Sequence, residues 1–329
     1  MMRTGMDRRP WLLLAALLCA AVWSHPRPVV AADEDDFQGL IEEVGKEYAE
    51  GYLAPLGTSF GVDQNTAIFS TAAIPRTRLT LGIGAKFMTA NIADDDATFR
   101  RVLNVTLDER YGVNPLDPAY GERGTVVMEG PTVFGNEDTP GTITAYYNGF
   151  PVGQVGGIEG FYDTSWMPLI VPQAEVGGIA GLRATVRWLP SISGPGDLGD
   201  INLLGYGLQY NISQHIPQPP MGLDFMVGFF RQELDLGDVI QTDATSFFLA
   251  ASKTFAVVTA YGGGAFEDSN IDVDYTEQTT GTHVAFTLDG KQERRVTVGG
   301  TLNLGLQQLN AEMSFGKLAT FGAGLMFGF

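Results

Sequence analysis

Residues 319–329, ATFGAGLMFGF, alternate between two sets of side chains. One side of an extended strand would carry Phe321, Ala323, Leu325, Phe327 and Phe329, and the other Thr320, Gly322, Gly324, Met326 and Gly328. A membrane barrel strand separates its lipid side from its lumen side by such alternation. A tilted strand of about 9–11 residues is long enough to cross a bilayer. The stretch therefore predicts a transmembrane strand.

Similar alternation recurs along much of the chain. It is clear over residues 78–90 and nearly continuous from about residue 165 onward, with candidate strands at 182–188, 204–213, 222–233, 245–254, 256–267, 270–278, 283–289, 294–304 and 307–315. We count ten strands from residue 165 onward and two to four before it. Because bacterial single-chain barrels have even strand numbers, we expect an all-β fold, a single transmembrane antiparallel β-barrel of about 12–14 strands. A soluble β-sandwich is the competing fold.

The region between about residues 91 and 164 lacks this regularity. Five prolines interrupt it, among many Gly, Asp and Asn residues. A stretch this long without periodicity is usually functional or disordered. In a barrel it would be an extracellular loop, an infolded constriction, or short strands mixed with turns.

Residues 1–32 have the pattern of a secretory signal peptide. Arg3, Arg8 and Arg9 precede an apolar run over residues 11–23, and Val30-Ala31-Ala32 offers small residues for cleavage. Removing this segment would also remove Cys19, the single cysteine of the chain. The expected organisation is a signal peptide (1–32), an N-terminal helix or plug segment (33–56) and a barrel (57–329).

Residues 33–56 predict an amphipathic helix. Phe37, Leu40, Ile41, Val44 and Tyr48 fall near one face at helical spacing, and Pro55 and Gly57 would end the helix. Two positions for the helix remain open. It packs under the barrel on the periplasmic side, or it plugs the lumen.

Charge and residue types exclude several functions. The chain holds 20 Lys and Arg against 38 Asp and Glu, and the first 32 residues contribute four of the former and one of the latter. Because phosphate binding needs clustered Lys and Arg, this acidity argues against a nucleic-acid partner. His215 and His283 lack a nucleophile elbow or a metal-binding spacing. We therefore expect no enzyme activity, no cofactor and no specific metal site.

The alternation also predicts which polar side chains face the lumen. These candidates are Arg183, Arg187, Gln209, Asn211, Asp224, Lys253, Asn303 and Glu312. Mixed charge suits a water-filled interior, but it equally suits a hydrogen-bonded core. Arg183 and Arg187 lie four residues apart on one face and are a candidate constriction pair.

Several segments resemble a family of outer-membrane β-barrel proteins of unknown function. They are Phe69-Ser70-Thr71-Ala72, Pro172-Gln173 with Gly177, Gly181 and Arg187, Gly205–Tyr210, Tyr261-Gly262-Gly263 with Asp272–Tyr275, and the terminal strand. The layout is also similar to outer-membrane transporters of long-chain fatty acids and other hydrophobic compounds, which have fourteen strands and an N-terminal plug. Their Asn-Pro-Ala signature is missing here, since Asn114-Pro115 is followed by Leu116.

These resemblances imply a protein of the bacterial outer membrane. The terminal Phe is similar to the signature that the barrel assembly machinery reads, so this machinery and outer-membrane lipids are the expected partners, along with a small hydrophobic ligand. The expected function is passive transport of small, hydrophobic molecules. The alternative is a structural or surface-interaction barrel, for which the lumen would be filled by side chains and residues 91–164 would stand outside.

Overall fold

A computed structural model describes residues 46–161, 164–193, 200–217, 219–237, 240–276 and 283–328. The predicted signal peptide and the first part of the predicted N-terminal helix lie outside these residues. Within them, no helix is long and apolar enough to cross a membrane.

The described part of the chain contains one α-helix and fifteen strands. They are α3 (Lys46–Gln64), β1 (Thr77–Asn91), β2 (Thr98–Thr106), β3 (Arg123–Pro131), β4 (Thr142–Tyr147), β5 (Phe150–Gly156), β6 (Trp166–Ile179), β7 (Leu182–Ser193), β8 (Asp200–Asn211), β9 (Asp224–Leu236), β10 (Ile240–Phe255), β11 (Val258–Thr276), β12 (His283–Asp289), β13 (Arg294–Leu304), β14 (Gln307–Phe315) and β15 (Thr320–Gly328).

Ten of these strands close into an antiparallel barrel. The sheet order is β10-β9-β8-β7-β6-β1-β15-β14-β13-β11-β12, and β10 also pairs with β11. β12 stands outside the closed ring, because it pairs with the far part of β11, from Asn270 to Thr276. The predicted fold class is confirmed, and the strand number is ten instead of 12–14.

Three features explain the smaller number. The predicted strand 283–289 is β12, which lies outside the ring. The strands between residues 92 and 165 pair with one another in a separate sheet of order β2-β3-β4-β5, which we call the small sheet. This region therefore consists of short strands mixed with turns, one of the three forms expected for it. In addition, the predicted strands 256–267 and 270–278 are a single strand, β11, of 19 residues.

The barrel strands alternate as the sequence predicts. In β15, Phe321, Leu325 and Phe327 are exposed on the outer wall, whereas Thr320 and Met326 are buried. Leu81 and Ile83 of β1 are likewise exposed. Because lipid replaces water around a membrane barrel, apolar side chains are stable on this outer wall.

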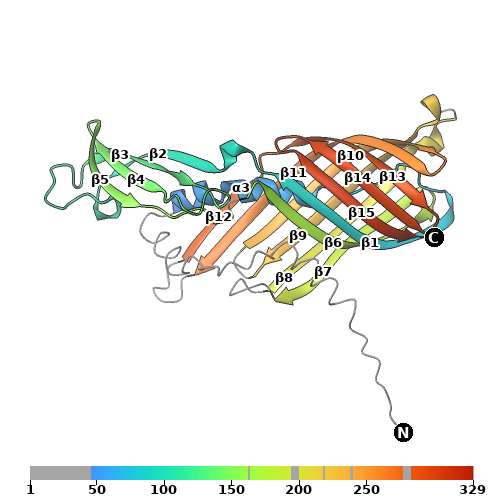
Figure 1. Ribbon diagram of the computed structural model, residues 1–329, viewed down its shortest axis with the longest axis horizontal. Coiled ribbons are helices and arrows are strands. Elements are labelled where there is room, and N and C mark those ends of the chain that lie inside the picture. The colour runs from blue at the N-terminus through green and yellow to red at the C-terminus, as the bar shows by residue number, and fades with distance from the viewer. Residues whose placement is uncertain are drawn as a thin grey trace, which may run out of the picture. The chain divides into compact units, whose positions relative to one another are not determined.

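The two ends of the barrel differ in their connections (Figure 1). At the turn end, residues 180–181, 256–257 and 305–306 form two-residue turns. The opposite, loop end carries the small sheet, which is inserted between Asn91 and Trp166, themselves register partners in β1 and β6. The last described residues of β15 lie at the turn end.

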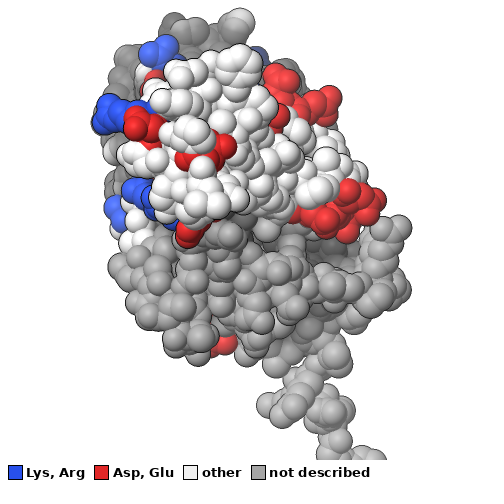
Figure 2. Space-filling view, turned by 90° about the vertical axis from the view of Figure 1, so that its left-hand side faces the viewer, with Lys and Arg blue, Asp and Glu red and all other residues white. Residues whose placement is uncertain are grey.

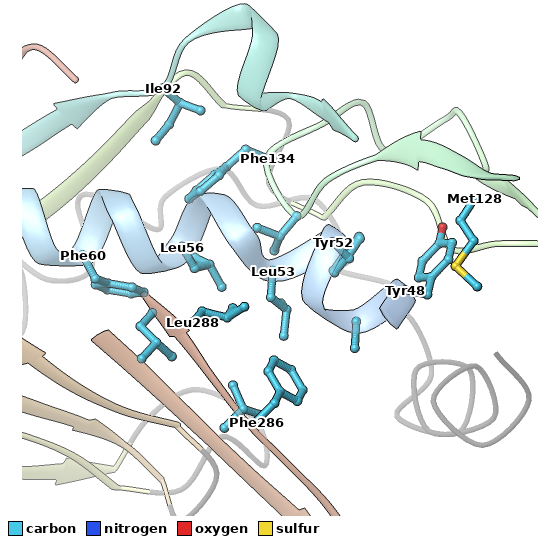
Figure 3. Close-up of a cluster of buried hydrophobic side chains, with 14 of the residues drawn as sticks. Tyr48, Tyr52, Leu53, Leu56, Phe60, Ile92, Met128, Phe134, Phe286 and Leu288 are labelled. Atoms are coloured by element: carbon cyan, nitrogen blue, oxygen red, sulfur yellow. The ribbon is translucent and has the colours of Figure 1, made fainter. Parts of the chain in front are cut away.

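Helix α3 is longer than predicted and is buried over nearly its whole circumference. It continues through Pro55 and Gly57 to Gln64, which corrects the predicted end. Proline in a helix interior costs about 3 kcal/mol, but here tertiary packing outweighs that cost. Leu53, Leu56 and Phe60 lie in a cluster with Phe286 and Leu288 of β12 (Figure 3).

Candidate functional site

The barrel lumen is occupied by the chain itself. After α3, residues 65–76 lead to the start of β1 at the turn end, and most of their side chains are buried. They are not part of any strand or helix. We call α3 and residues 65–76 together the plug.

Inward-facing side chains from around the barrel bind the backbone of the plug. Gln209 Nε2 donates to Ile68 O at 3.3 Å, Thr301 Oγ1 to Ser70 O at 2.7 Å, and Asn211 Nδ2 to Ala72 O at 3.0 Å. Arg183 donates to Thr71 O at 3.3 Å and to Ala73 O at 3.4 Å. Because buried backbone groups must be paired, these bonds substitute for the missing secondary structure.

Two plug amides are bound as well. Ala67 N donates to Glu312 Oε1 at 2.8 Å, and Ala72 N donates to Ser252 Oγ at 2.9 Å. Glu312 also accepts a hydrogen bond from Tyr261 Oη at 3.0 Å. Side chains of the barrel thus bind both the N–H and the C=O groups of the plug backbone.

Arg187 joins the plug to three barrel strands. Its side chain is completely buried and donates to Gln64 O at 2.9 Å and Thr66 O at 2.8 Å. It also donates to Gln173 Oε1 at 2.9 Å and lies 5.0 Å from the centre of the Phe230 ring. A planar guanidinium suits this position, because its fixed donors reach several acceptors at once.

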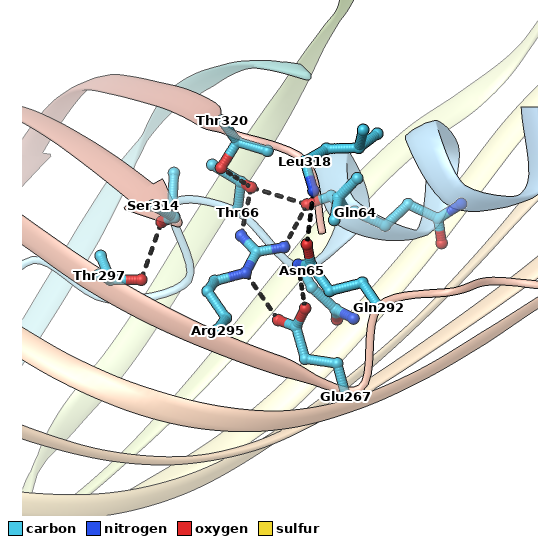
Figure 4. A network of polar contacts seen from close by, with 12 residues as sticks. Gln64, Asn65, Thr66, Glu267, Gln292, Arg295, Thr297, Ser314, Leu318 and Thr320 are labelled. Atoms are coloured by element: carbon cyan, nitrogen blue, oxygen red, sulfur yellow. Dashed lines mark hydrogen bonds and ion pairs between the residues drawn. The ribbon is translucent and has the colours of Figure 1, made fainter. Parts of the chain in front are cut away.

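A second arginine organises the loop end of the lumen (Figure 4). Arg295 Nε pairs with Glu267 Oε1 at 2.9 Å, Nη2 donates to Val62 O at 2.6 Å, and Nη1 bonds Thr66 Oγ1. Gln292 links this group to the connection between β14 and β15. Its Nε2 donates to Glu267 Oε2 at 2.8 Å, and its Oε1 accepts from Leu318 N at 3.2 Å. The last turn of α3 is thereby fixed to β11, β13 and the β14–β15 connection.

Apolar contacts fill the other side of the lumen. The Phe69 ring stacks on Phe248 at 5.2 Å and meets Tyr261 edge-on at 5.7 Å. A cavity beside these residues and Asn65 measures about 10 Å³. A cavity of that size holds about one water molecule, so this part of the lumen has no room for a solute.

The structure places seven of the eight predicted lumen residues on the inner side. Arg183, Arg187, Gln209, Asn211 and Glu312 bind the plug, as described above. Asp224 accepts from Asn211 Nδ2 at 3.3 Å, and Asn303 donates to Thr259 Oγ1 at 3.2 Å. Arg183 and Arg187 do not face an open channel, because both donate to plug carbonyls.

Lys253 corrects the prediction for the eighth residue. It alternates with the buried Ser252 and shares the outward side of β10 with the exposed Phe247 and Leu249. Its Nζ donates to Met221 O at 2.6 Å at the turn end. The inward assignment of Lys253 was wrong, because the two-residue alternation from Phe247 and Leu249 places it on the outer side. A lysine near a strand end can reach polar groups from there.

Several residues that hold the plug were not among the predicted lumen residues. Arg295, Glu267, Ser252, Thr301 and Tyr261 face inward, and Lys86 Nζ donates to Asn310 Oδ1 at 2.8 Å inside the lumen. The period-two pattern of β11 and β13 contained this signal. The plug residues 65–76 themselves have no periodicity that could have predicted their position.

The small sheet packs against the N-terminal half of α3. Tyr48 packs edge-on against Phe99 at 4.9 Å, and its hydroxyl donates to Ile158 O at 3.5 Å. The backbones of Gly141 and Gly157 approach this hydroxyl so closely that a Cβ atom on either would collide with it. Burial raises the pKa of Tyr48 to about 12. Arg101 adds ion pairs with Glu47 at 2.8 Å and Glu50 at 2.9 Å.

No group of three or more His, Cys, Asp or Glu residues in the described part of the chain is arranged to hold a metal ion. His215 Nε2 lies 2.5 Å from Tyr210 Oη near the turn end. The side chain of His283 lies outside the described residues.

A model of a family of unknown function, DUF6588, matches residues 9–329. The chain belongs to this family. No curated protein matches it.

Solved structures similar to the chain are bacterial outer-membrane barrels. OmpT of Vibrio cholerae is 12% identical over 76% of this chain and 99% of that chain, with a TM-score of 0.24. The toluene transporter TbuX of Ralstonia pickettii is 9% identical over 85% and 97%, with a TM-score of 0.30. An anion-selective porin from Comamonas acidovorans is 13% identical over 77% and 99%, with a TM-score of 0.18. These likenesses concern the fold alone.

Proposed function

We propose that the protein is a plugged barrel of the outer membrane of a Gram-negative bacterium, and that it holds the small sheet at the membrane surface for contact with an external partner. The observation that carries this proposal is the binding of the plug backbone, from Val62 to Ala73, by side chains around the lumen. Passive diffusion needs a continuous aqueous path, and the plug occupies that path.

The small sheet has the properties of a contact surface. Its two connections to the barrel are bonded to each other, because Ile92 N donates to Ser165 O at 2.8 Å. Leu116 is 92% exposed and Phe150 is 73% exposed. Figure 2, which views the molecule from the left-hand side of Figure 1, shows basic residues along one edge and acidic residues at the opposite edge and near the middle. Exposed apolar side chains with charged residues around them are typical of protein contact sites.

Passive transport of small hydrophobic molecules is the second candidate. One observation favours it: the plug is a single segment N-terminal to β1, and no barrel strand depends on it for pairing. It can therefore leave the lumen while the barrel stays closed. The side chains that now bind the plug, including Arg183, Arg187 and Glu312, would then line the channel.

Conductance in a planar lipid bilayer distinguishes the two functions. We expect no current steps from the chain lacking residues 1–32, and discrete steps after deletion of residues 33–73. Deletion of residues 33–45 alone is the matched control, since these residues precede the described plug. Current steps from the undeleted chain would contradict the plugged barrel. Steps that begin only when a hydrophobic solute is added would favour transport.

Cell-adhesion measurements test whether the small sheet contacts an external partner. Cells that express the protein are compared with cells that express a variant in which a short linker replaces residues 94–163. A surface-contact function requires that the variant inserts normally but loses adhesion to host extracts or to other cells. Equal adhesion of both, together with solute uptake that depends on the protein, would contradict it.

A further inference from the structure

The outer wall of the barrel has a hollow of about 360 Å³. Leu81 and Ile83 of β1, Val186 of β7 and Phe327 of β15 surround it, and the small side chains of Ala174 and Ala184 leave it open. The hollow lies on the outward, apolar face and is as large as small-molecule sites usually are. Glu175 also lines it, although its carboxylate pairs with Arg183 Nε at 3.7 Å.

Two arginines lie at the turn end of β1, the strand whose Leu81 and Ile83 line this hollow. Arg76 and Arg78 are exposed and have no ion-pair partner among the described residues. The β1–β6 register is irregular between Thr77 and Thr80, so Arg78 lies in a bulge. Bulges redirect side chains. Since a strand rises about 3.3 Å per residue, Arg78 lies roughly 10 Å from Leu81 along β1.

The charge at the turn end is the reverse of the charge of the whole chain. Among the described residues there, Arg76 and Arg78 are exposed and Lys253 is half-buried, whereas the acidic Asp224 is bonded to Asn211. The whole chain has a formal net charge of −18. Exposed arginines beside an apolar hollow at membrane depth match an amphiphile that has an acyl chain and an anionic head.

We propose that this hollow and the two arginines bind an anionic phospholipid of the leaflet at the turn end. An acyl chain occupies the space over Ala174 and Ala184, and the lipid phosphate is held by Arg76 and Arg78. Guanidinium groups bind phosphate through paired hydrogen bonds, and long basic side chains reach to the headgroup level from a strand end. The inference rests on the membrane location proposed above and is independent of the contact role of the small sheet.

Native mass spectrometry of the chain lacking residues 1–32 tests this site. The protein is titrated in detergent with phosphatidylglycerol or with phosphatidylcholine of the same acyl chains. We expect tighter retention of phosphatidylglycerol, and a loss of about fivefold in its affinity for each arginine removed in R76A and R78A. K253A is the matched control, because it removes a half-buried turn-end cation on the distant strand β10. The affinity of this variant for phosphatidylglycerol should be unchanged.

The apolar half of the site is tested by A184F and A174F, which fill the hollow from the outer side. Both should lower retention of either lipid, whereas an L249F variant elsewhere on the outer wall should not. Equal retention of the two lipids by the unmodified protein, or equal losses in K253A and R78A, would overturn the site. Insertion into vesicles is measured in parallel: a protein that does not insert contradicts the membrane location, and one that inserts without lipid preference contradicts only this site.

Discussion

Arg187 shows how a single side chain links the plug to the barrel. It is fully buried on β7 and bonds two plug carbonyls as well as Gln173 of β6. A buried charge is stable only when its hydrogen-bonding groups are satisfied. The lumen therefore depends on the plug for polar pairing as much as the plug depends on the lumen.

Replacing Arg187 by Ala should destabilise the folded protein strongly. The variant leaves Gln64 O and Thr66 O without their donors in a buried site. A buried acceptor that is left without its donor costs about 1–3 kcal/mol, and the variant leaves two such carbonyls. Urea unfolding in detergent micelles, followed by tryptophan fluorescence, measures the change. K253A removes a partly exposed cation from the outer side and should change the free energy of unfolding by less than about 0.5 kcal/mol. Similar values for the two variants would contradict the assigned role.

Tyr48 fixes the N-terminal part of α3 through close contacts with the glycines around its hydroxyl. Because a Cβ at Gly141 would collide with the Tyr48 hydroxyl and with no other atom, G141A should weaken the packing of the small sheet on α3. Y48F removes the oxygen that causes this collision. We expect G141A to be less costly in the Y48F background, with a coupling energy of about 0.5–3 kcal/mol. The rate of protease cleavage within α3 measures how firmly the small sheet packs against this helix. R101A serves as a control, since partly exposed ion pairs contribute about 0–1 kcal/mol. Additive effects would contradict the contact.

The same hydroxyl predicts a dependence on high pH. Burial raises the pKa of Tyr48 to about 12, whereas an unfolded tyrosine has a pKa of about 10. The folded state therefore holds the proton more tightly, and stability is lost as pH rises from about 10 toward 12, by about 1.4 kcal/mol per pH unit. Urea unfolding of the native protein and of Y48F at pH 9, 10 and 11 isolates this effect. The two proteins should diverge above pH 10, and parallel curves would contradict it.

At the scale of elements, the sequence predicted the barrel strands well and the plug poorly. The alternation of residues 78–90 and of the terminal strand reflects a physical difference between lipid and lumen, so it is visible in the sequence. The continuation of α3 beyond Pro55 depends on burial against β12 and the small sheet, which no local pattern records. Residues 65–76 are irregular, and most of their side chains are buried in the lumen whichever way they point, so the sequence shows no alternation there.

The candidate site shows the same limit. The two-residue alternation of the strands indicated that Arg183, Gln209 and Glu312 face inward, but it could not indicate what they bind. Their partners are backbone groups of the plug, more than 100 positions distant in sequence. Lys253 was assigned to the wrong side, although its alternation with Phe247 and Leu249 places it on the outer side.

The small sheet is an element that the barrel does not need for closure. Asn91 and Trp166 are paired across β1 and β6, so a short linker can replace residues 94–163. We expect this variant to form a closed barrel that keeps its heat-dependent gel mobility. Tyr48 and Tyr52 lose their partners Ile158 and Glu159, so the first turns of α3 should become protease-sensitive. Loss of the folded barrel would show that the small sheet is required for assembly. Protection of α3 in the variant would show that the small sheet does not grip it.

For the whole molecule, the lengths of the connections at the two ends of the barrel predict its orientation in a membrane. In bacterial barrels, short turns face the periplasm and longer loops face the cell exterior. The two-residue turns and the end of β15 share one end, whereas the small sheet and Lys46 share the other. We therefore expect the plug to run from the exterior toward the periplasm before β1 returns.

This orientation can be tested with single cysteines, because Cys19 is the only cysteine and lies in the predicted signal peptide. Cysteines replace Lys46 and Leu116 at the loop end and Leu306 at the turn end, all of which are exposed. A membrane-impermeant maleimide should label K46C and L116C on intact cells, and L306C only after the outer membrane is opened. Labelling of L306C alone on intact cells would reverse the orientation. It would also place the lipid site of Arg76 and Arg78 in the outer leaflet, so that its natural ligand would be an outer-leaflet lipid. Labelling of L116C but not K46C would show that the plug is shielded from outside although the small sheet is accessible.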